Sequence, residues 1–170
     1  SHGMCLPMLG QFGTEEQKAR YLPDNISGRA IWCQMFSEPG AGSDVAGLSM
    51  RAVRDGDEWI LDGQKVWTSG AHYCDFGIVV ARTDPTLPKH QGLSMFIVDM
   101  RAPGIEVRPL VQISGARNFN EVFFSDARIP AANLLGEVNQ GWNLAVSMLM
   151  FERVSIGAGG GALNARRCPE

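Results

Sequence analysis

The sequence predicts a mainly β domain, built from short antiparallel strands as a barrel or sandwich and flanked by helical segments. Between about residue 30 and residue 130, short apolar stretches follow one another closely, with glycine and proline between them. No helical pattern separates these stretches, which favours a barrel or sandwich over alternating strands and helices. On both sides of this region the chain has helical features instead.

The N-terminal segment contains a short predicted helix in "GTEEQKARYLP". Thr14 is suited to cap its start, and Gln17 follows three residues later, which is the spacing of a capping box. Proline cannot donate the backbone hydrogen bond that a helix interior requires, so we expect Pro23 to end the helix. Residues 1–29 are therefore expected to be helical or connecting.

The β region is predicted from a series of apolar stretches: "IWCQMF", "LSMRAVR", "EWIL", "QKVW", "FGIVVAR", "LSMFIVD", "GIEVRPL" and "NEVFFSDARI". Asp55-Gly56 separates the second stretch from the third, and Asp62-Gly63 separates the third from the fourth. Because Asp-Gly between apolar stretches is a strong hairpin signal, both pairs are predicted to be hairpin turns.

A second helix is predicted from Gly141 onward. Its apolar face comprises Trp142, Ala145, Val146, Met148, Leu149, Phe151 and Ile156. Four glycines follow in "GAGGGALNARR", and each costs about 1 kcal/mol relative to alanine inside a helix. Two interpretations stay open at this point: close packing of the helix against another helix or a ligand, or a frayed helix end.

Composition excludes several classes of protein. The net charge is −3 and no basic stripe indicates nucleic-acid binding. No apolar stretch approaches the roughly 18 residues of a membrane-spanning helix, and the first residues show no secretory pattern. The four cysteines and three histidines are dispersed without metal-ligand spacing, so we expect free thiols, a reducing compartment and no metal site.

The stretch "SEPGAGSD" at residues 37–44 has two possible roles. Gly40 and Gly42 permit backbone angles that other residues avoid, so a tight turn here can point its N–H groups outward. Such groups bind anions, and Ser43 adds a hydroxyl donor. Neither the P-loop pattern nor G-x-G-x-x-G is present. On spacing alone, the stretch is either a phosphate-binding turn or a simple turn at a strand end.

The combination of "MFSEPGAGSD" with "GDEWILDGQKVWTSGAHYCDFGIVVARTDP" resembles the middle domain of the acyl-CoA dehydrogenases. The similarity continues through "GLSMFIVD", "GIEVRPL", "NEVFFSDARIPAANLLGEVNQGW" and "ERVSIGAG", so it covers nearly the whole chain. It implies that residues 1–29 end an N-terminal helical domain, residues 30–135 form the middle β domain, and residues 136–170 begin a C-terminal helical domain.

The resemblance implies an FAD site assembled from two segments. The first would line the flavin ring, largely through backbone groups, and its glycine turn would contact the FAD pyrophosphate and the CoA part of the substrate. In the second, Trp67 would cover one face of the flavin and Ser69 would hydrogen-bond its central ring. The implied cofactor-binding residues are Gln34, Phe36, Ser37, Gly42, Ser43, Trp67, Thr68 and Ser69.

The match to the family pattern is not complete. Ser37 stands where most members have threonine, and Thr68-Ser69 departs from the frequent Ile-Thr version, although the hydroxyls at residues 37 and 69 are kept. From periodicity alone, Phe36 and Trp67 are equally well explained as core aromatics.

Glu152 and Arg153 occur in "FERVSIGAG". A minority of the family, including the isovaleryl and long-chain enzymes, carries its catalytic base at the position of Glu152, directly before an arginine. The alternatives are a base farther along the C-terminal domain, or a surface glutamate on an amphipathic helix. The resemblance also implies substrate contacts through Ser43, Arg153 and, with a weaker match, His90.

The function implied by the resemblance is FAD-dependent α,β-dehydrogenation of an acyl-CoA to the trans-2-enoyl-CoA. The expected partners are an acyl-CoA, an electron-transfer flavoprotein and further copies of the chain, in a bacterial cytoplasm or a mitochondrial matrix. Because much of the family's helical bundle is not in these 170 residues, we expect them to be inactive alone. A flavin oxidase or monooxygenase of the same fold, and a cofactor-free barrel, are the alternatives.

Overall fold

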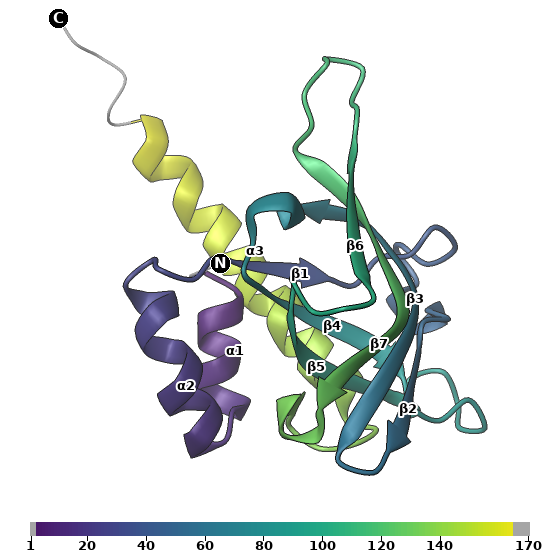
Figure 1. The fold of residues 1–170 in the computed structure, drawn as a ribbon. Helices are drawn as coiled ribbons and strands as arrows, with labels where there is room; N and C mark the ends of the chain where they lie inside the picture. The colour runs from purple at the N-terminus through teal and green to yellow at the C-terminus, as the bar shows by residue number, and fades with distance from the viewer. Residues whose placement is uncertain (1–2, 165–170) are drawn as a thin grey trace, which may run out of the picture.

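The structure is a computed structural model that describes residues 3–164 (Figure 1). Its α-helices are α1 (Cys5–Phe12), α2 (Glu15–Ile26) and α3 (Gly141–Asn164). Its strands are β1 (Trp32–Met35), β2 (Arg51–Asp55), β3 (Glu58–Ser69), β4 (Phe76–Arg82), β5 (Leu93–Asp99), β6 (Ile105–Leu110), β7 (Phe119–Pro130) and β8 (Leu134–Leu135). Short 3₁₀ turns are η1 (Val45–Gly47), η2 (Ala71–Tyr73) and η3 (Ala131–Asn133).

The strands form a single mixed sheet. Their order is β6-β7-β3-β2-β4-β5-β8, and β1 pairs with β4 outside this path. β1 and β2 run parallel to β4, whereas the other pairings within residues 3–164 are antiparallel. The predicted mainly β domain flanked by helices is confirmed. The sheet stays open rather than closing into a barrel, because the path ends at β6 on one side and at the two-residue β8 on the other.

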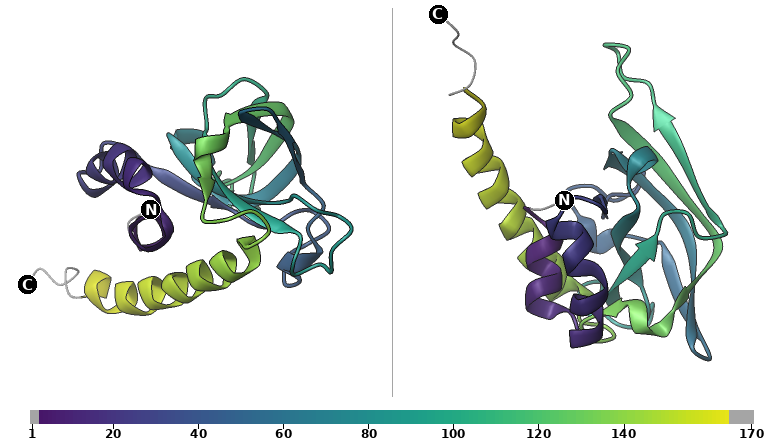
Figure 2. Two further views of the ribbon diagram at one scale, coloured as in Figure 1. Left: turned by 90° about the horizontal axis from the view of Figure 1, so that it is seen from below. Right: turned by 60° about the vertical axis from the view of Figure 1, so that its left-hand side comes forward.

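β4 and β5 lie between two apolar cores. On β4, Ile78 and Val80 belong to a core shared with the three helices, whereas Val79 and Ala81 belong to a core shared with β2, β3 and β7. Figure 2 shows the helices grouped on one side of the molecule, while the long strands β3 and β7 lie on the other side. A strand with apolar residues on both faces must be covered on both faces, which explains the uninterrupted apolar stretches.

α2 begins as predicted but ends later. The Thr14 hydroxyl accepts a hydrogen bond from the Gln17 N–H at 3.2 Å, and the Gln17 side chain accepts one from the Thr14 N–H at 3.1 Å, which completes the capping box. The prediction that Pro23 ends the helix is wrong, since α2 continues to Ile26. The proline lies in the last turn, where its missing N–H removes only a single helical hydrogen bond.

Only the first of the two Asp-Gly pairs forms a hairpin. Asp55 pairs with Glu58 across a tight turn in which Gly56 has a φ of 58°. The prediction of a second turn at Asp62-Gly63 is wrong, because β3 continues through this pair, with a shift of register against β7 between Leu61 and Gly63. Gly63 has a φ of 145°, and an added Cβ would lie 2.9 Å from the Met50 Cα. The glycine therefore allows β2 to approach β3 closely instead of reversing the chain.

α3 includes the glycine cluster without a break in its backbone, so the interpretation of a frayed end from Gly157 onward is not supported. A Cβ at Gly157 would meet no atom within 4 Å, so close packing is not seen at this position. The side chains beyond it lie outside the described residues.

The cysteines of the described chain carry free thiols. Cys5, Cys33 and Cys74 are free and buried, while Cys168 falls outside the described chain. Within residues 3–164, no helix is long and apolar enough to cross a membrane.

Gly63→Ala is expected to destabilise the fold by about 1–3 kcal/mol, because alanine disfavours this φ and its Cβ meets a neighbouring backbone. Urea unfolding measures the change. The matched control is Gly10→Ala, in α1, where a Cβ would meet nothing within 4 Å. This control is expected to leave stability unchanged or to raise it by about 0.5–1 kcal/mol. Equal stability of Gly63→Ala and the wild type would contradict the close approach of β2.

Candidate active site

A cleft of about 350 Å³ lies between the sheet and the helices. Its lining brings together six of the side chains predicted from the sequence: Gln34, Phe36, Ser37, Trp67, Ser69 and Glu152. They come from β1 and the residues after it, from the end of β3 and from α3. Three segments that are far apart in the chain therefore meet around one cavity.

The alternation of β1 decides which of its side chains meet the helices. Trp32 and Phe36 belong to the core shared with the helices, and Gln34 stands between them on the same face. Ser37 follows the strand, and its carbonyl accepts a hydrogen bond from the Val66 N–H at 2.9 Å. This bond connects the "SEPGAGSD" segment to the "WTS" segment through their backbones.

Trp67 stands in a β-bulge near the end of β3. Between Lys65 and Thr68 the register against β7 shifts by one residue, and Trp67 has a φ of 60°. The indole is 61% exposed and meets Phe119 edge to face, with ring centroids 6.0 Å apart. A large aromatic in left-handed backbone is a strained arrangement, and such strain is concentrated at functional sites.

The bulge also separates the side chains of the "WTS" segment. Trp67 and Ser69 line the cleft, whereas Thr68 is buried, and no hydrogen-bond partner is found for its hydroxyl among the described residues. The Thr68 carbonyl accepts a hydrogen bond from Asn120 at 2.9 Å. Of the three residues predicted here, the structure therefore brings the side chains of two to the cleft.

Glu152 reaches the cleft from α3. It follows the buried Ala145 by seven residues and the buried Met148 by four, which places it on the same face of the helix. Its carboxylate Oε2 accepts a hydrogen bond from the Gln34 Nε2 at 3.3 Å. The Glu152 carboxylate is therefore half-buried and faces β1 across the cleft.

A buried ion pair holds the turn that follows β1. The Lys65 Nζ donates to a Glu38 carboxylate oxygen at 2.9 Å and to the Phe36 carbonyl at 3.0 Å. Both side chains are almost fully buried, at 0% and 5% exposure. Glu38 also accepts hydrogen bonds from the N–H of Ser49 and the N–H of Met50, at 2.7 and 3.0 Å. The pair thus fixes residues on both sides of the glycine turn to β3.

Both members of this pair are charged near neutral pH. Burial lowers the pKa of Lys65 from 10.5 to about 8, and the Glu38 carboxylate opposes this shift. Burial alone would raise the pKa of Glu38, but the Lys65 ammonium and the N–H donors of Ser49 and Met50 hold it below its ordinary value of 4.5. A lower pKa favours the charged form of Glu38 and disfavours the charged form of Lys65. At pH 7 both groups are nevertheless ionised, because this pH lies above the pKa of Glu38 and below that of Lys65.

The glycine turn has a different geometry from the one expected. Gly40 and Gly42 do not adopt the left-handed φ for which glycine was argued, although a Cβ at either would meet nothing within 4 Å. The Glu38 and Ala41 backbones exchange two hydrogen bonds, at 2.8 and 3.1 Å, which close the turn. Gly42 and Ser43 are exposed beyond it and do not line the cleft.

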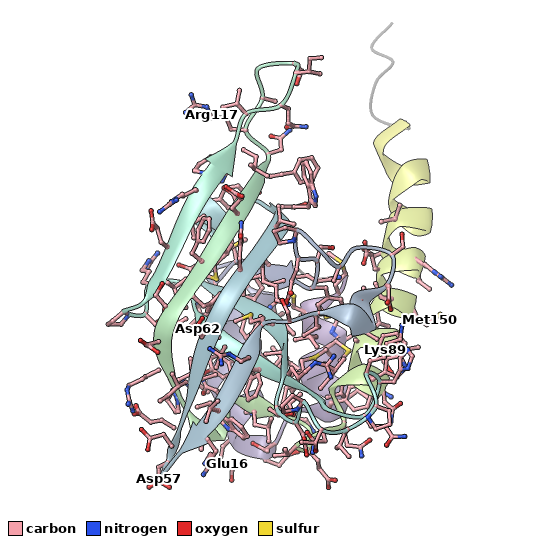
Figure 3. All side chains as sticks on the ribbon, turned by 90° about the vertical axis from the view of Figure 1, so that its right-hand side faces the viewer. Glu16, Asp57, Asp62, Lys89, Arg117 and Met150 are labelled. Atoms are coloured by element: carbon pink, nitrogen blue, oxygen red, sulfur yellow. The ribbon has the colours of Figure 1, made fainter. Side chains whose placement is uncertain are left out.

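The two other predicted substrate residues also lie outside the cleft. His90 lines a separate pocket of about 410 Å³ and contacts the Trp142 ring at 4.6 Å between centroids. Next to it, Lys89 forms an exposed salt bridge with Asp44 at 2.8 Å, which joins this loop to the glycine turn. In the view of Figure 3, Lys89 lies on the same side of the molecule as α3, and Arg117 lies at the tip of the loop between β6 and β7. Arg153 is exposed on α3 beside Met150.

The sequence did not indicate several other residues of the cleft wall. Tyr73 is 59% exposed at the end of η2, and Cys33 and Cys74 also line the cavity. Gly70, which directly follows the "WTS" segment, has a φ of 66° and turns the chain into η2. A glycine directly after a predicted site segment was the signal that could have placed Tyr73 at the cleft.

The cleft can hold a planar group with a polar edge. It offers the exposed indole of Trp67, the hydroxyls of Ser37 and Ser69, and the Gln34 side chain, whose buried Oε1 has no hydrogen-bond partner among the described residues. Among the same residues, no group of three or more acidic, cysteine or histidine side chains could hold a metal ion. The fold and cleft therefore define a mainly β domain whose helix-facing side carries a cleft with a carboxylate at its edge.

Comparison with known proteins identifies this class more closely. The model of the acyl-CoA dehydrogenase middle domain matches residues 33–127, so the chain belongs to the acyl-CoA dehydrogenase family. It is 50% identical to acyl-CoA dehydrogenase FadE34 of Mycobacterium tuberculosis, covering 90% of this chain and 22% of that protein. It is 38% identical to mitochondrial isovaleryl-CoA dehydrogenase of Pongo abelii, covering 92% of this chain and 38% of that protein.

A solved structure supports the same conclusion. The chain superimposes with a TM-score of 0.88 on the Tcur3481-Tcur3483 steroid ACAD, at 42% identity, covering 94% of this chain and 41% of that one. In length, the chain spans between 22% and 40% of the curated relatives that it matches.

Lys65→Met is expected to destabilise the fold by about 3–5 kcal/mol, because it leaves the Glu38 charge buried without its partner. Urea unfolding of the variant checks this, and the double variant Glu38→Gln/Lys65→Met should recover part of the loss. Lys89→Met, which removes an exposed partner of Asp44, is the control and should change stability little. A single Lys65 variant as stable as the wild type would refute the structural role of the pair.

Acid should weaken the same pair. The folded pKa of Glu38 is lowered from 4.5, so its contribution is complete above pH 4.5 and is lost as the pH falls through the lower, folded pKa. Urea midpoints measured across this acidic range should fall more steeply for the wild type than for Glu38→Gln/Lys65→Met. Parallel curves for the two proteins would show that Glu38 does not carry this dependence.

Proposed function

We propose that this domain forms the catalytic centre of an FAD-dependent acyl-CoA dehydrogenase, which converts an acyl-CoA to its trans-2-enoyl-CoA. The observation that carries the proposal is the position of Glu152, whose carboxylate lines the same cleft as Ser37, Trp67 and Ser69. A carboxylate next to a site for a planar cofactor has the arrangement that abstraction of an α proton requires.

Each cleft residue has a role in this proposal. Trp67 and Phe36 would hold the flavin through their aromatic rings, since both line the cleft. The hydroxyls of Ser37 and Ser69 would be its hydrogen-bond donors, whereas Thr68, whose side chain is buried away from the cleft, would contribute only its backbone. Glu152 removes the α proton of the thioester. The bound flavin would supply the acceptor for the β hydride.

The CoA part of the substrate is proposed to lie outside the cleft. Gly42 and Ser43 form an exposed turn with open space above the glycine, which suits the pyrophosphate of FAD and the neighbouring part of CoA. The salt bridge between Lys89 and Asp44 keeps the loop that carries His90 beside this turn. Arg153 is exposed on α3 one residue after the proposed base and is available to the CoA moiety.

The complete reaction is proposed to need more chain than these 170 residues, since the relatives extend well beyond the matched part. We expect the 170 residues to be inactive alone, the complete enzyme to form a dimer or tetramer, and an electron-transfer flavoprotein to accept its electrons.

Relatives with the higher identities come from mycobacteria, which supports a bacterial cytoplasm over a mitochondrial matrix. A steroid-derived acyl group is one substrate class to test, given the steroid ACAD relative.

Glu152→Gln in the complete FAD-loaded enzyme is expected to lower the rate of flavin reduction by an acyl-CoA by at least about a hundredfold. FAD content should stay as in the wild type, because Glu152 is not among the proposed cofactor donors. Stopped-flow absorbance under anaerobic conditions measures the reduction. A variant that reduces flavin at the wild-type rate would place the base elsewhere in the complete protein.

The same preparation separates the alternatives. Reoxidation by air that is as fast as reoxidation by an electron-transfer flavoprotein would favour a flavin oxidase or monooxygenase. A complete protein that takes up no FAD during reconstitution would favour a cofactor-free domain.

A further inference from the structure

We propose that Gln34 positions the carboxylate of Glu152 for proton abstraction. This inference rests on the proposed function, because it assigns to a second residue the task of orienting the proposed base. Gln34 lies on β1 and Glu152 on α3, so the contact joins the sheet to the helix across the cleft. The resemblance assigned Gln34 only to the flavin site, largely through its backbone.

The contact itself fixes one end of the base. The Gln34 Nε2 donates to the Glu152 Oε2 at 3.3 Å, and the amide can present its N–H only to an acceptor, which sets the orientation of the amide group. Glu152 is half-buried, and a glutamate side chain can rotate toward solvent about several bonds. Holding Oε2 limits this rotation and leaves Oε1 for the substrate proton.

The other end of the Gln34 amide indicates that stability alone does not explain the residue. Its Oε1 is buried and lacks a hydrogen-bond partner among residues 3–164. A buried polar atom without a partner weakens the fold, so an apolar residue between Trp32 and Phe36 would be the more stabilising choice. The amide is therefore explained by the cleft that it lines, where its N–H contacts Glu152 and its Oε1 is left for a bound group.

The chain contains a matched pair away from the cleft. The Gln64 Nε2 donates to the Glu121 Oε1 at 2.9 Å, between β3 and β7. Neither residue lines the cleft. Gln64→Met removes the same kind of hydrogen bond as Gln34→Met, with the same change in side-chain volume, and serves as the control for general effects on the sheet.

The test measures proton abstraction without hydride transfer. The probe is an acyl-CoA analogue with sulfur in place of the β carbon, which keeps its α protons but has no β hydride to donate. The complete FAD-loaded enzyme is incubated with this probe in D₂O, and mass spectrometry follows deuterium entering the α position. FAD content and the dissociation constant of the probe are measured for each variant.

Gln34→Met is expected to slow this exchange about tenfold to a hundredfold per bound FAD, measured at a saturating concentration of the probe. Gln34→Glu, which also lacks the amide donor, should be at least as slow, and it provides a second variant if the first folds poorly. Gln64→Met should exchange like the wild type. In a Glu152→Gln background, Gln34→Met should have no further effect.

Three results would overturn the inference. Wild-type exchange in both Gln34 variants, with Glu152→Gln inactive, would leave Glu152 as the base without help from Gln34. Equal slowing by Gln34→Met and Gln64→Met would assign the effect to the sheet in general. Wild-type exchange in Glu152→Gln would remove the base itself, which is a failure of the proposed function and is distinguishable from the first two results.

Discussion

The buried contact between Lys65 and Glu38 is the constraint on which the site depends. The ammonium reaches both the Glu38 carboxylate and the Phe36 carbonyl, and the carboxylate in turn binds the N–H groups of Ser49 and Met50. One lysine of β3 therefore fixes the end of β1, the glycine turn and the start of β2. Buried charges are tolerated only when their hydrogen bonds are satisfied, so none of these segments can shift alone. The exposed glycine turn consequently projects from residues that are held in place on both sides.

Local rules predicted the elements better than the contacts between them. The capping box at Thr14 and the hairpin after Asp55 depend on neighbouring residues only, and the structure confirms both. The predictions for Pro23 and Gly63 are wrong because the effect of each residue depends on where the fold places it. A proline in a last turn costs one hydrogen bond, and the Gly63 position requires room for Met50 instead of a turn. The bulge that turns Thr68 away from Trp67 and Ser69 likewise depends on β7, which local spacing does not reveal.

The site shows the same division. Its candidate residues were named from the sequence through resemblance, and six of them share one cleft. The hydrogen bond between Gln34 and Glu152 joins positions separated by 118 residues, so no local pattern contains it. Tyr73, Cys33 and Cys74 were missed because only the packed fold brings η2 and β1 to the same wall. The residue types that bear chemistry could be predicted, but their partners required the three-dimensional arrangement.

The two central strands, β4 and β5, cannot rely on a hydrophobic-polar alternation to fix their register against neighbouring strands. Because β4 and β5 are apolar on both faces, sliding either by one residue would exchange its two apolar faces at little cost in burial. Their register is therefore set by particular residues: by Gly77 of β4, where a Cβ would lie 3.0 Å from the Cys33 Sγ, and by polar groups at the strand ends. Arg82 donates to the Leu48 and Ala46 carbonyls at one end of β4, and Asp75 accepts the Ile31 N–H and binds Arg101 at the other. In this domain, one core glycine and half-buried polar residues at the strand ends carry the alignment information that a half-buried sheet would store in its alternating pattern.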